Sequence, residues 1–246
     1  MRCQPRHNKP VYIWLKNNQI CLLCDEPADG TVPICTACET ELPWLGDHCE
    51  TCALPLPAAG LTCGQCQQHP PAFERVIVPW TYSFPLDSLI TRFKHNAKWP
   101  FGHLLAELLG QFLQHRFEND LPIPELLLPV PLATRRLRQR GFNQAAMLAR
   151  WLSVSLNIPC DERLLVRKQD TGSQQGLNAQ ARKRNLRNAF ALSPDATVKG
   201  RHLALVDDVL TTGATAQALA RLLMDAGAAR VDVYCLARTP KPGDTA

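Results

Sequence analysis

Two adjacent carboxylates and a turn rich in hydroxyl groups follow a short apolar run near the end of the chain. The run Leu203–Val206 has the character of a buried strand, and a helical pattern begins at Ala214. Backbone N–H groups of such a turn, backed by the helix dipole, form a binding site for an oxyanion. The neighbouring carboxylates suit ribose hydroxyls or hydrated Mg²⁺. An ordinary surface turn rarely has this composition, so we predict a phosphate site that includes Asp207, Asp208, Thr211, Thr212, Gly213 and Thr215.

Four Cys-x-x-Cys pairs recur at intervals of fourteen residues in the N-terminal part of the chain. One pair places two thiolates on a metal ion, and two pairs complete a tetrahedral zinc site. Disulfides would need an oxidising compartment, which a chain without a recognisable targeting segment is not expected to reach. We therefore predict two structural zinc ions, with consecutive or crossed pairing left open. Their ligands are Cys21, Cys24, Cys35, Cys38, Cys49, Cys52, Cys63 and Cys66.

Charge is distributed unevenly along the 246 residues, whose formal net charge is +5. All 27 lysines and arginines lie outside Cys21–Cys66, which contains seven acids. Thiolate-bound zinc adds further negative charge, so this segment should repel nucleic acid and is better suited to a structural or protein-docking role. No apolar run approaches the roughly 20 residues of a membrane helix. We expect a cytoplasmic protein that does not associate with membranes.

A second group of chemically suited residues is cationic. Arg135, Arg136, Arg138 and Arg140 crowd what we expect to be a loop before a helix beginning near Asn143. Arginine forks bind phosphate oxygens in pairs, and Gly141 permits close approach to Arg140. Lys94 follows an amphipathic run and is either a solvated lysine at a helix end or a phosphate contact. Arg140 and Lys94 are our candidate catalytic residues.

A polar, glycine-containing stretch from Asp170 to Gly176 lacks any apolar anchor, and a basic helical segment follows at about 178–189. Such a loop can close over a substrate and exclude water, which matters if an activated ribose is to escape hydrolysis. The lid candidates are Thr171, Gln174 and Arg182.

The elements that must position these groups alternate between strand and helix. Strands are expected at 73–82, 125–131, 164–166, 203–206 and 231–236, and helices at 85–93, 101–117, from 143 and at 214–226. This alternation predicts an α/β parallel sheet with its site at the carboxyl ends of the strands. We expect an N-terminal extension (1–20), a cysteine-rich module (21–69), an α/β domain (70–239) and a tail (240–246).

Several of these motifs together resemble the ComF/GntX family. They are the Cys-x-x-Cys pairs, Phe93-Lys94, Pro129–Pro131, Arg140-Gly-Phe-Asn-Gln144, Thr171-x-x-Gln174-x-x-Leu177, Arg182-x-x-Asn185, Ala189-Phe190 and VDDVLTTGAT at 206–215. The last is similar to the phosphoribosyl-pyrophosphate (PRPP) motif of type I phosphoribosyltransferases. The resemblance covers nearly all the chain after about residue 20.

The resemblance implies a double zinc ribbon on a type I phosphoribosyltransferase-like domain, in a protein linked to competence and DNA utilisation. It implies that Asp207 and Asp208 hold the ribose 2′- and 3′-hydroxyls of PRPP. It also implies that the residues from Leu210 to Thr215, Ala214 included, wrap the 5′-phosphate.

Two functions are consistent with the sequence. The first is a Mg²⁺-dependent phosphoribosyltransferase that binds PRPP and transfers its phosphoribosyl group to a nucleobase-like acceptor. The alternative is a non-catalytic adaptor of DNA uptake, which would bind single-stranded DNA through the basic remainder of the chain and a protein partner through the acidic zinc module. Few aromatic residues are expected to be available for base stacking.

Overall fold

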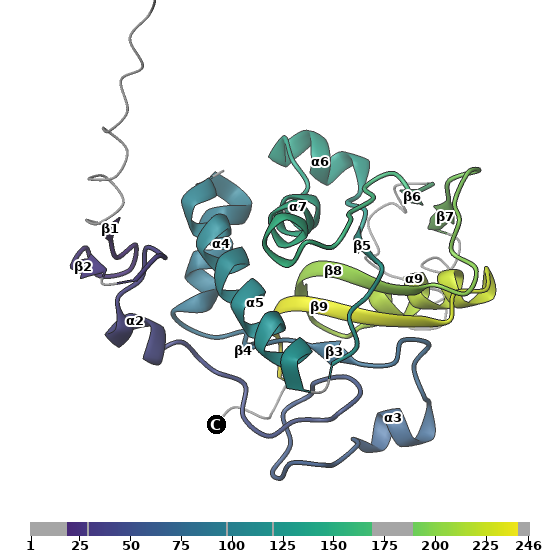
Figure 1. Ribbon diagram of the computed structural model, residues 1–246, viewed down its shortest axis with the longest axis horizontal. Helices are drawn as coiled ribbons and strands as arrows, with labels where there is room; N and C mark the ends of the chain where they lie inside the picture. Colours follow the sequence, from purple (N-terminus) through teal and green to yellow (C-terminus); the bar gives the residue numbers. More distant parts are fainter. Residues whose placement is uncertain (1–18, 29, 97, 120, 169–188, 241–246) are drawn as a thin grey trace, which may run out of the picture. The chain divides into compact units, whose positions relative to one another are not determined.

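The computed structural model describes residues 19–28, 30–96, 98–119, 121–168 and 189–240. The chain forms two compact units, the first ending at Leu42 and the second beginning at Pro43. The first unit contains the antiparallel pair β1 (Gln19–Ile20) and β2 (Pro27–Ala28), followed by α2 (Thr36–Thr40) (Figure 1). The boundaries that we expect at residues 20, 69 and 239 stay predictions about domain organisation.

A parallel sheet forms the centre of the second unit. Its strands are β5 (Leu126–Pro129), β8 (His202–Leu210) and β9 (Arg230–Arg238), with β3 (Val76–Ile77) and β4 (Trp80–Thr81) both paired to the outer edge of β9. Every pairing in this sheet is parallel. The predicted parallel α/β architecture is therefore confirmed.

Helices cover both faces of the sheet (Figure 1). On one face, α5 (Trp99–Asn119) packs against α7 (Gln144–Leu156), and α4 (Leu86–Asn96) packs against α5. On the other face lies α9 (Ala214–Asp225), which connects β8 to its neighbour β9. Among the described residues, no helix has both the length and the apolar character of a membrane span.

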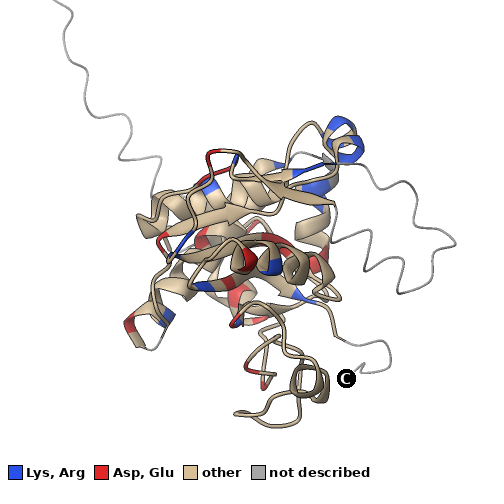
Figure 2. Cartoon of the chain, turned by 90° about the vertical axis from the view of Figure 1, so that its right-hand side faces the viewer, with Lys and Arg blue, Asp and Glu red and all other residues tan. Residues whose placement is uncertain are grey.

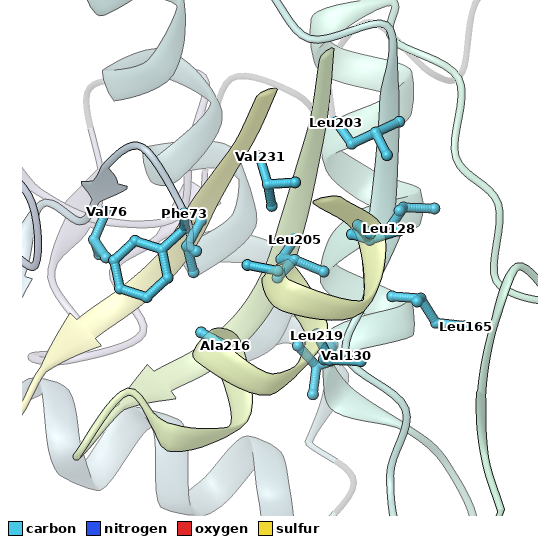
Figure 3. Close-up of a cluster of buried hydrophobic side chains, with 14 of the residues drawn as sticks. Phe73, Val76, Leu128, Val130, Leu165, Leu203, Leu205, Ala216, Leu219 and Val231 are labelled. Carbon is cyan, nitrogen blue, oxygen red and sulfur yellow. The ribbon is translucent and has the colours of Figure 1, made fainter. Parts of the chain in front are cut away.

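Apolar side chains on both faces of β8 explain its central position. Leu203 and Leu205 join a core cluster that includes Ala216 and Leu219 of α9 (Figure 3). The alternate residues Ala204 and Val206 are equally buried. A strand covered on both sides is expected to be continuously apolar, and this is the pattern of the run that precedes the acidic pair.

Three predicted elements differ from the structure. The strand expected at 73–82 is divided into β3 and β4, because Pro79 between them has no N–H to donate and its carbonyl accepts from Leu45 instead. β8 continues to Leu210, so Asp207 and Asp208 lie within a strand. The arginine-rich loop is a helix, α6 (Thr134–Arg140).

Some short elements, in addition to β1 and β2, were not expected from the sequence pattern. β7 (Phe190–Leu192) pairs antiparallel with β6 (Leu165–Arg167), on either side of the undescribed residues 169–188. The short helices α2 and α3 (Gly64–Gln68) each begin just after a predicted zinc ligand, Cys35 and Cys63 respectively.

Candidate functional site: two four-cysteine sites and a cavity at the sheet edge

The eight predicted zinc ligands form two four-sulfur sites, one in each compact unit. Consecutive Cys-x-x-Cys pairs share a site, so the crossed arrangement is excluded: one site has Cys21, Cys24, Cys35 and Cys38, the other Cys49, Cys52, Cys63 and Cys66. The sulfur atoms of each site lie within 4.8 Å of one another, and all eight are free thiols.

The spacing between the sulfur atoms fits zinc. The Sγ atoms of Cys24 and Cys35 are 3.7 Å apart, and those of Cys52 and Cys63 are also 3.7 Å apart. Four sulfurs at about 2.3 Å from a tetrahedral Zn²⁺ are separated by about 3.8 Å, whereas a disulfide needs about 2.0 Å. The donor set and its geometry therefore suit two structural zinc ions.

Backbone amides favour the thiolate form of one cysteine in each site. Burial acts to raise the pKa of Cys21, but N–H groups of Cys35, Leu23 and Cys24 lower it to about 6. Cys49 follows the same rule: burial opposes ionisation, and N–H groups that include that of Cys63, whose nitrogen is 3.2 Å from the sulfur, lower its pKa to about 7. Thiolate is the form that binds zinc.

The second four-cysteine site is built into the α/β unit. Ala53 is fully buried in the main core cluster, against which Leu45 and Cys52 also pack. The backbone N–H of Val76, in β3, donates to the carbonyl of Thr51 at 2.9 Å. The loops around α3 show acidic but no basic residues, as expected from the sequence (Figure 2).

A cavity of about 450 Å³ lies at the carboxyl ends of the parallel strands, where ligands of open α/β sheets usually bind. Residues after β4, β5 and β9 contribute to its wall, together with the end of β8 and the start of α7. It brings together six predicted site residues: Lys94, Arg140, Asp207, Asp208, Thr211 and Thr215.

The acidic pair at the centre of this cavity is partly neutralised by Lys94, whose Nζ lies 3.0 Å from Oδ2 of Asp208. Lys94 and Asp208 are only 17% and 14% exposed, so this is not a solvated surface pair. Burial, and secondarily the negative charge of Asp208, raises the pKa of Asp207 from 3.8 to about 7. An acid pair of this kind can bind a cation or accept hydrogen bonds from neighbouring hydroxyls.

The turn after β8 leads through a left-handed residue into the N-terminus of α9. Gly213 precedes α9 with φ of 72°, in the left-handed region that glycine adopts most readily. Thr211 and Thr215 line the cavity, and Thr212 Oγ1 accepts from the N–H of Ala214 at 3.4 Å. Leu210 is 4% exposed and belongs to the core. Leu210, Thr212, Gly213 and Ala214 are not among the residues that line the cavity.

α6 contributes two arginines, Arg136 and Arg140, to the cavity wall, and the start of α7 contributes Gln144 beside them. α6 stands out by its bases (Figure 2), and it ends at Gly141, whose φ is 80°. The Nη1 of Arg140 donates to Oε1 of Gln144 at 3.0 Å. Gln144 is only 2% exposed, and its Nε2 has no hydrogen-bond partner among the described residues. A buried donor of this kind on a cavity wall suits an anionic ligand.

Arg136, a member of the predicted arginine cluster, also lines the cavity, whereas sequence reasoning missed Tyr82, Gln144, Arg167 and Thr239. Gln144 belongs to the Arg140–Gln144 motif, and its position at the start of an amphipathic helix is the signal that could have identified it. Tyr82 and Thr239 carry no signal of their own, because only strand pairing brings the ends of β4 and β9 to this edge. The lid candidates Thr171, Gln174 and Arg182 lie outside the described residues.

Comparison with known proteins agrees with this arrangement. Residues 18–67 match the double zinc ribbon domain family, and residues 139–244 match the phosphoribosyl transferase domain family. DNA utilization protein YhgH of Salmonella typhi is 40% identical over 173 residues, which cover 70% of this chain and 75% of that protein. Competence protein F of Haemophilus influenzae is 37% identical over 170 residues, covering 68% and 74%.

Among solved structures, the chain is similar to a purine phosphoribosyltransferase from Pyrococcus horikoshii, with 19% sequence identity and a TM-score of 0.36. The matched region covers 55% of this chain and 71% of that protein. This last likeness is too weak to support an inference. The two family matches show that the chain combines a double zinc ribbon with a phosphoribosyltransferase domain. Together with the two relatives, they show that it belongs to the ComF family, which includes DNA utilization protein YhgH and competence protein F.

Proposed function

We propose that this protein binds PRPP with Mg²⁺ in the cavity at the sheet edge and transfers the phosphoribosyl group to a nucleobase-like acceptor, as part of the use of external DNA. The chemistry is supported by the phosphoribosyl transferase domain match, which includes both Arg140 and the turn after β8. The biological setting is supported by the relatives named for DNA utilization and competence.

The observation that carries the proposal is the convergence of three different groups on one cavity. The acidic pair Asp207–Asp208 suits ribose hydroxyls and Mg²⁺, and the turn with Thr211 and Thr215 suits a phosphate. Opposite them, Arg140 and the unpartnered Nε2 of Gln144 suit a pyrophosphate group. One molecule that requires all three kinds of contact is PRPP.

In this proposal, the chain's own residues orient the substrate and stabilise the leaving group. The acceptor nitrogen forms its bond to C1 of the ribose as the bond from C1 to the pyrophosphate oxygen breaks. The electron pair of that bond leaves with pyrophosphate, which takes up the proton that the acceptor nitrogen loses. Arg140 and Lys94 counter the charge that develops there, which is a larger contribution in a partly buried site than in water. Bound Mg²⁺ supplies further charge neutralisation for the diphosphate.

Lys94 has a second part in this scheme. It pairs with Asp208 in the structure, so the carboxylate is free to meet a hydroxyl or cation only when the ammonium group moves to another acceptor. The oxygens of the incoming diphosphate are such an acceptor. Substrate binding then exchanges one ion pair for another and leaves neither charge uncompensated, which keeps the desolvation cost low.

Calorimetry with PRPP and Mg²⁺ tests binding. The unaltered protein should bind, and the double variant Asp207→Ala, Asp208→Ala should not. Asp225→Asn, an exposed acid at the far end of α9, is the matched control and should bind normally. If the unaltered, zinc-loaded protein shows no heat of binding, the proposal is wrong.

Release of pyrophosphate across a panel of nucleobases tests catalysis and separates the two functions. A phosphoribosyltransferase releases pyrophosphate with at least one acceptor, and Arg140→Met should abolish release while circular dichroism remains normal. The alternative, a non-catalytic adaptor, predicts no release with any base and salt-sensitive binding of single-stranded DNA.

A further inference from the structure

Arg238 is a buried arginine at the end of β9 that the proposed chemistry does not use. It is 7% exposed, although a charged side chain is seldom buried without several partners. Among the described residues, no carboxylate forms an ion pair with its guanidinium. Its hydrogen bonds go to backbone carbonyl groups, and these belong to three separate segments.

The carbonyl acceptors of Arg238 connect the second four-cysteine site with the phosphate-binding turn. Its Nε donates to the carbonyl of Cys52, a ligand residue of that site, at 3.0 Å. Its Nη1 donates to the carbonyls of Leu210 at 3.1 Å and Thr211 at 2.5 Å, where the turn begins. The same nitrogen contacts the carbonyl of Thr239, on the cavity wall, at 2.7 Å.

A guanidinium group is planar and rigid, so carbonyls that share it are held at set positions relative to one another. Hydrogen bonds to a charged donor are also stronger than neutral ones. Displacing the carbonyl of Cys52 would therefore either break a bond to a buried charge or shift Leu210 and Thr211 with it. Zinc fixes the position of Cys52, because a small ribbon depends on its metal for an ordered backbone.

We propose that Arg238 is a positioning residue that couples the second four-cysteine site to the phosphate-binding turn, so that zinc bound by Cys49, Cys52, Cys63 and Cys66 holds the turn in its binding conformation. The inference relies on the proposed function for what the turn binds, but the coupling itself needs no substrate. The first four-cysteine site belongs to the other compact unit, whereas the hydrogen bonds that Arg238 makes to described residues all stay within its own unit. It provides a control within the same chain.

Hydrogen exchange in the full-length, zinc-loaded protein tests the coupling, with peptides that cover Val209–Thr215 as the readout. Removing the second zinc through Cys63→Ser with Cys66→Ser should speed their exchange about tenfold, the effect of losing one hydrogen bond to a charged group. Removing the first zinc through Cys35→Ser with Cys38→Ser should not change it.

Two arginine variants show whether Arg238 transmits the effect. Arg238→Lys keeps the positive charge but loses the planar guanidinium that binds several carbonyls at once, so hydrogen exchange at Val209–Thr215 should become faster. Removing the second zinc from this variant should then increase the exchange rate little further. Arg230→Lys is the matched control, because Arg230 begins the same strand and bonds to buried Asp232. It should leave both exchange and the zinc effect at Val209–Thr215 unchanged.

Zinc release to a chelator gives a second reading if a cysteine variant fails to fold. Coupling is reciprocal, so Arg238→Lys should release one of the two zinc ions about tenfold faster than the unaltered protein, whereas Arg230→Lys should not. The first-site variant, which retains only the second zinc, identifies which ion is released.

Unchanged exchange at Val209–Thr215 after loss of the second zinc, or a zinc effect that persists in Arg238→Lys, would overturn the coupling. Neither result depends on PRPP. Failure of the unaltered protein to bind PRPP would overturn the proposed function and leave these results as they are.

Discussion

Asp207 shows how one partly buried acidic side chain can oppose stability in a binding site. Desolvation of its carboxyl group, together with the charge of the adjacent Asp208, raises its pKa to about 7. The native state therefore holds a proton that the unfolded chain loses above its ordinary pKa of 3.8. Stability contributed by this group falls as pH rises from about 4 to 7, and the cost is fully present above about 7.

Asp207→Asn should therefore stabilise the protein in the absence of substrate, and increasingly so at higher pH. The amide keeps the oxygen that accepts from the N–H of Asp208 but carries no charge. We expect a gain in the free energy of unfolding of roughly 1–3 kcal/mol at pH 8.5 and about half of that at pH 5.5, which lies midway between the two pKa values. Urea unfolding at the two pH values measures it, with Asp225→Asn as control. A gain that does not depend on pH would contradict the assignment.

Lys94→Met should destabilise the substrate-free protein and favour metal binding. The change leaves Asp208 beside Asp207 without its cation, at a cost of about 1–2 kcal/mol after allowance for partial solvent access. Mn²⁺ should restore the lost thermal stability by binding the carboxylates that the ammonium group no longer occupies.

Thermal unfolding with and without Mn²⁺ checks this prediction, and Lys98→Met, an exposed lysine nearby, serves as control. Equal stability of Lys94→Met and the unaltered protein would show that the ion pair with Asp208 contributes nothing in solution.

The chemical types of the site residues were predictable, whereas their partners were not. Asp207, Thr211 and Arg140 stand out because their neighbours in sequence share their chemistry. Arg238, by contrast, has no neighbour in sequence that shares its chemistry, and we did not predict any role for it. Its burial depends on the carbonyls of Cys52 and Leu210, which are far away in sequence.

At the scale of elements, β8 and the turn after it determine where the site lies. The carboxylates suggested that the strand ends at Val206, but β9 continues opposite Asp207 and pairs with β8 as far as Leu210. The length of a strand depends on its partner, which one segment of sequence does not reveal. The same holds for α6, whose arginines are compatible with a loop or a helix.

The left-handed conformation of Gly213 gives a prediction about this element. A Cβ added there would meet no atom within 4 Å, so the cost of substitution is due to the backbone alone. Gly213→Ala should lower stability by about 1 kcal/mol, and Gly213→Asn by less, because Asn tolerates this region better.

Thermal unfolding and phosphate binding of these two variants provide the measurement. Gly46→Ala is a suitable control, since its site is equally open and its backbone is outside the left-handed region. Alanine and asparagine variants of equal stability would contradict the backbone explanation.

For the whole molecule, the two zinc ions should contribute unequally to the α/β unit. The ribbon of the second site supplies Ala53 to the main core, whereas the first site belongs to the other compact unit. Loss of the second zinc through Cys63→Ser with Cys66→Ser should lower the unfolding temperature of the α/β unit by about 5–10 °C.

Loss of the first zinc through Cys35→Ser with Cys38→Ser should leave that temperature almost unchanged. Fluorescence of the fully buried Trp80 reports on the α/β unit during thermal unfolding, and metal analysis confirms which ion is lost. If the two pairs of substitutions lowered the unfolding temperature equally, the prediction that the two zinc ions contribute unequally to the α/β unit would be wrong.

The division of the zinc ribbons between compact units also bears on how such a protein can evolve. Residues 18–67 match the double zinc ribbon family as one segment, which suggests that recombination could exchange this segment as a whole. The boundary between the compact units, however, lies within this segment, between Leu42 and Pro43. A gene fusion that replaced the entire segment would remove Ala53 from the core and a hydrogen-bond acceptor from Arg238. Replacing the first ribbon alone, up to Leu42, would leave both of these contacts in place.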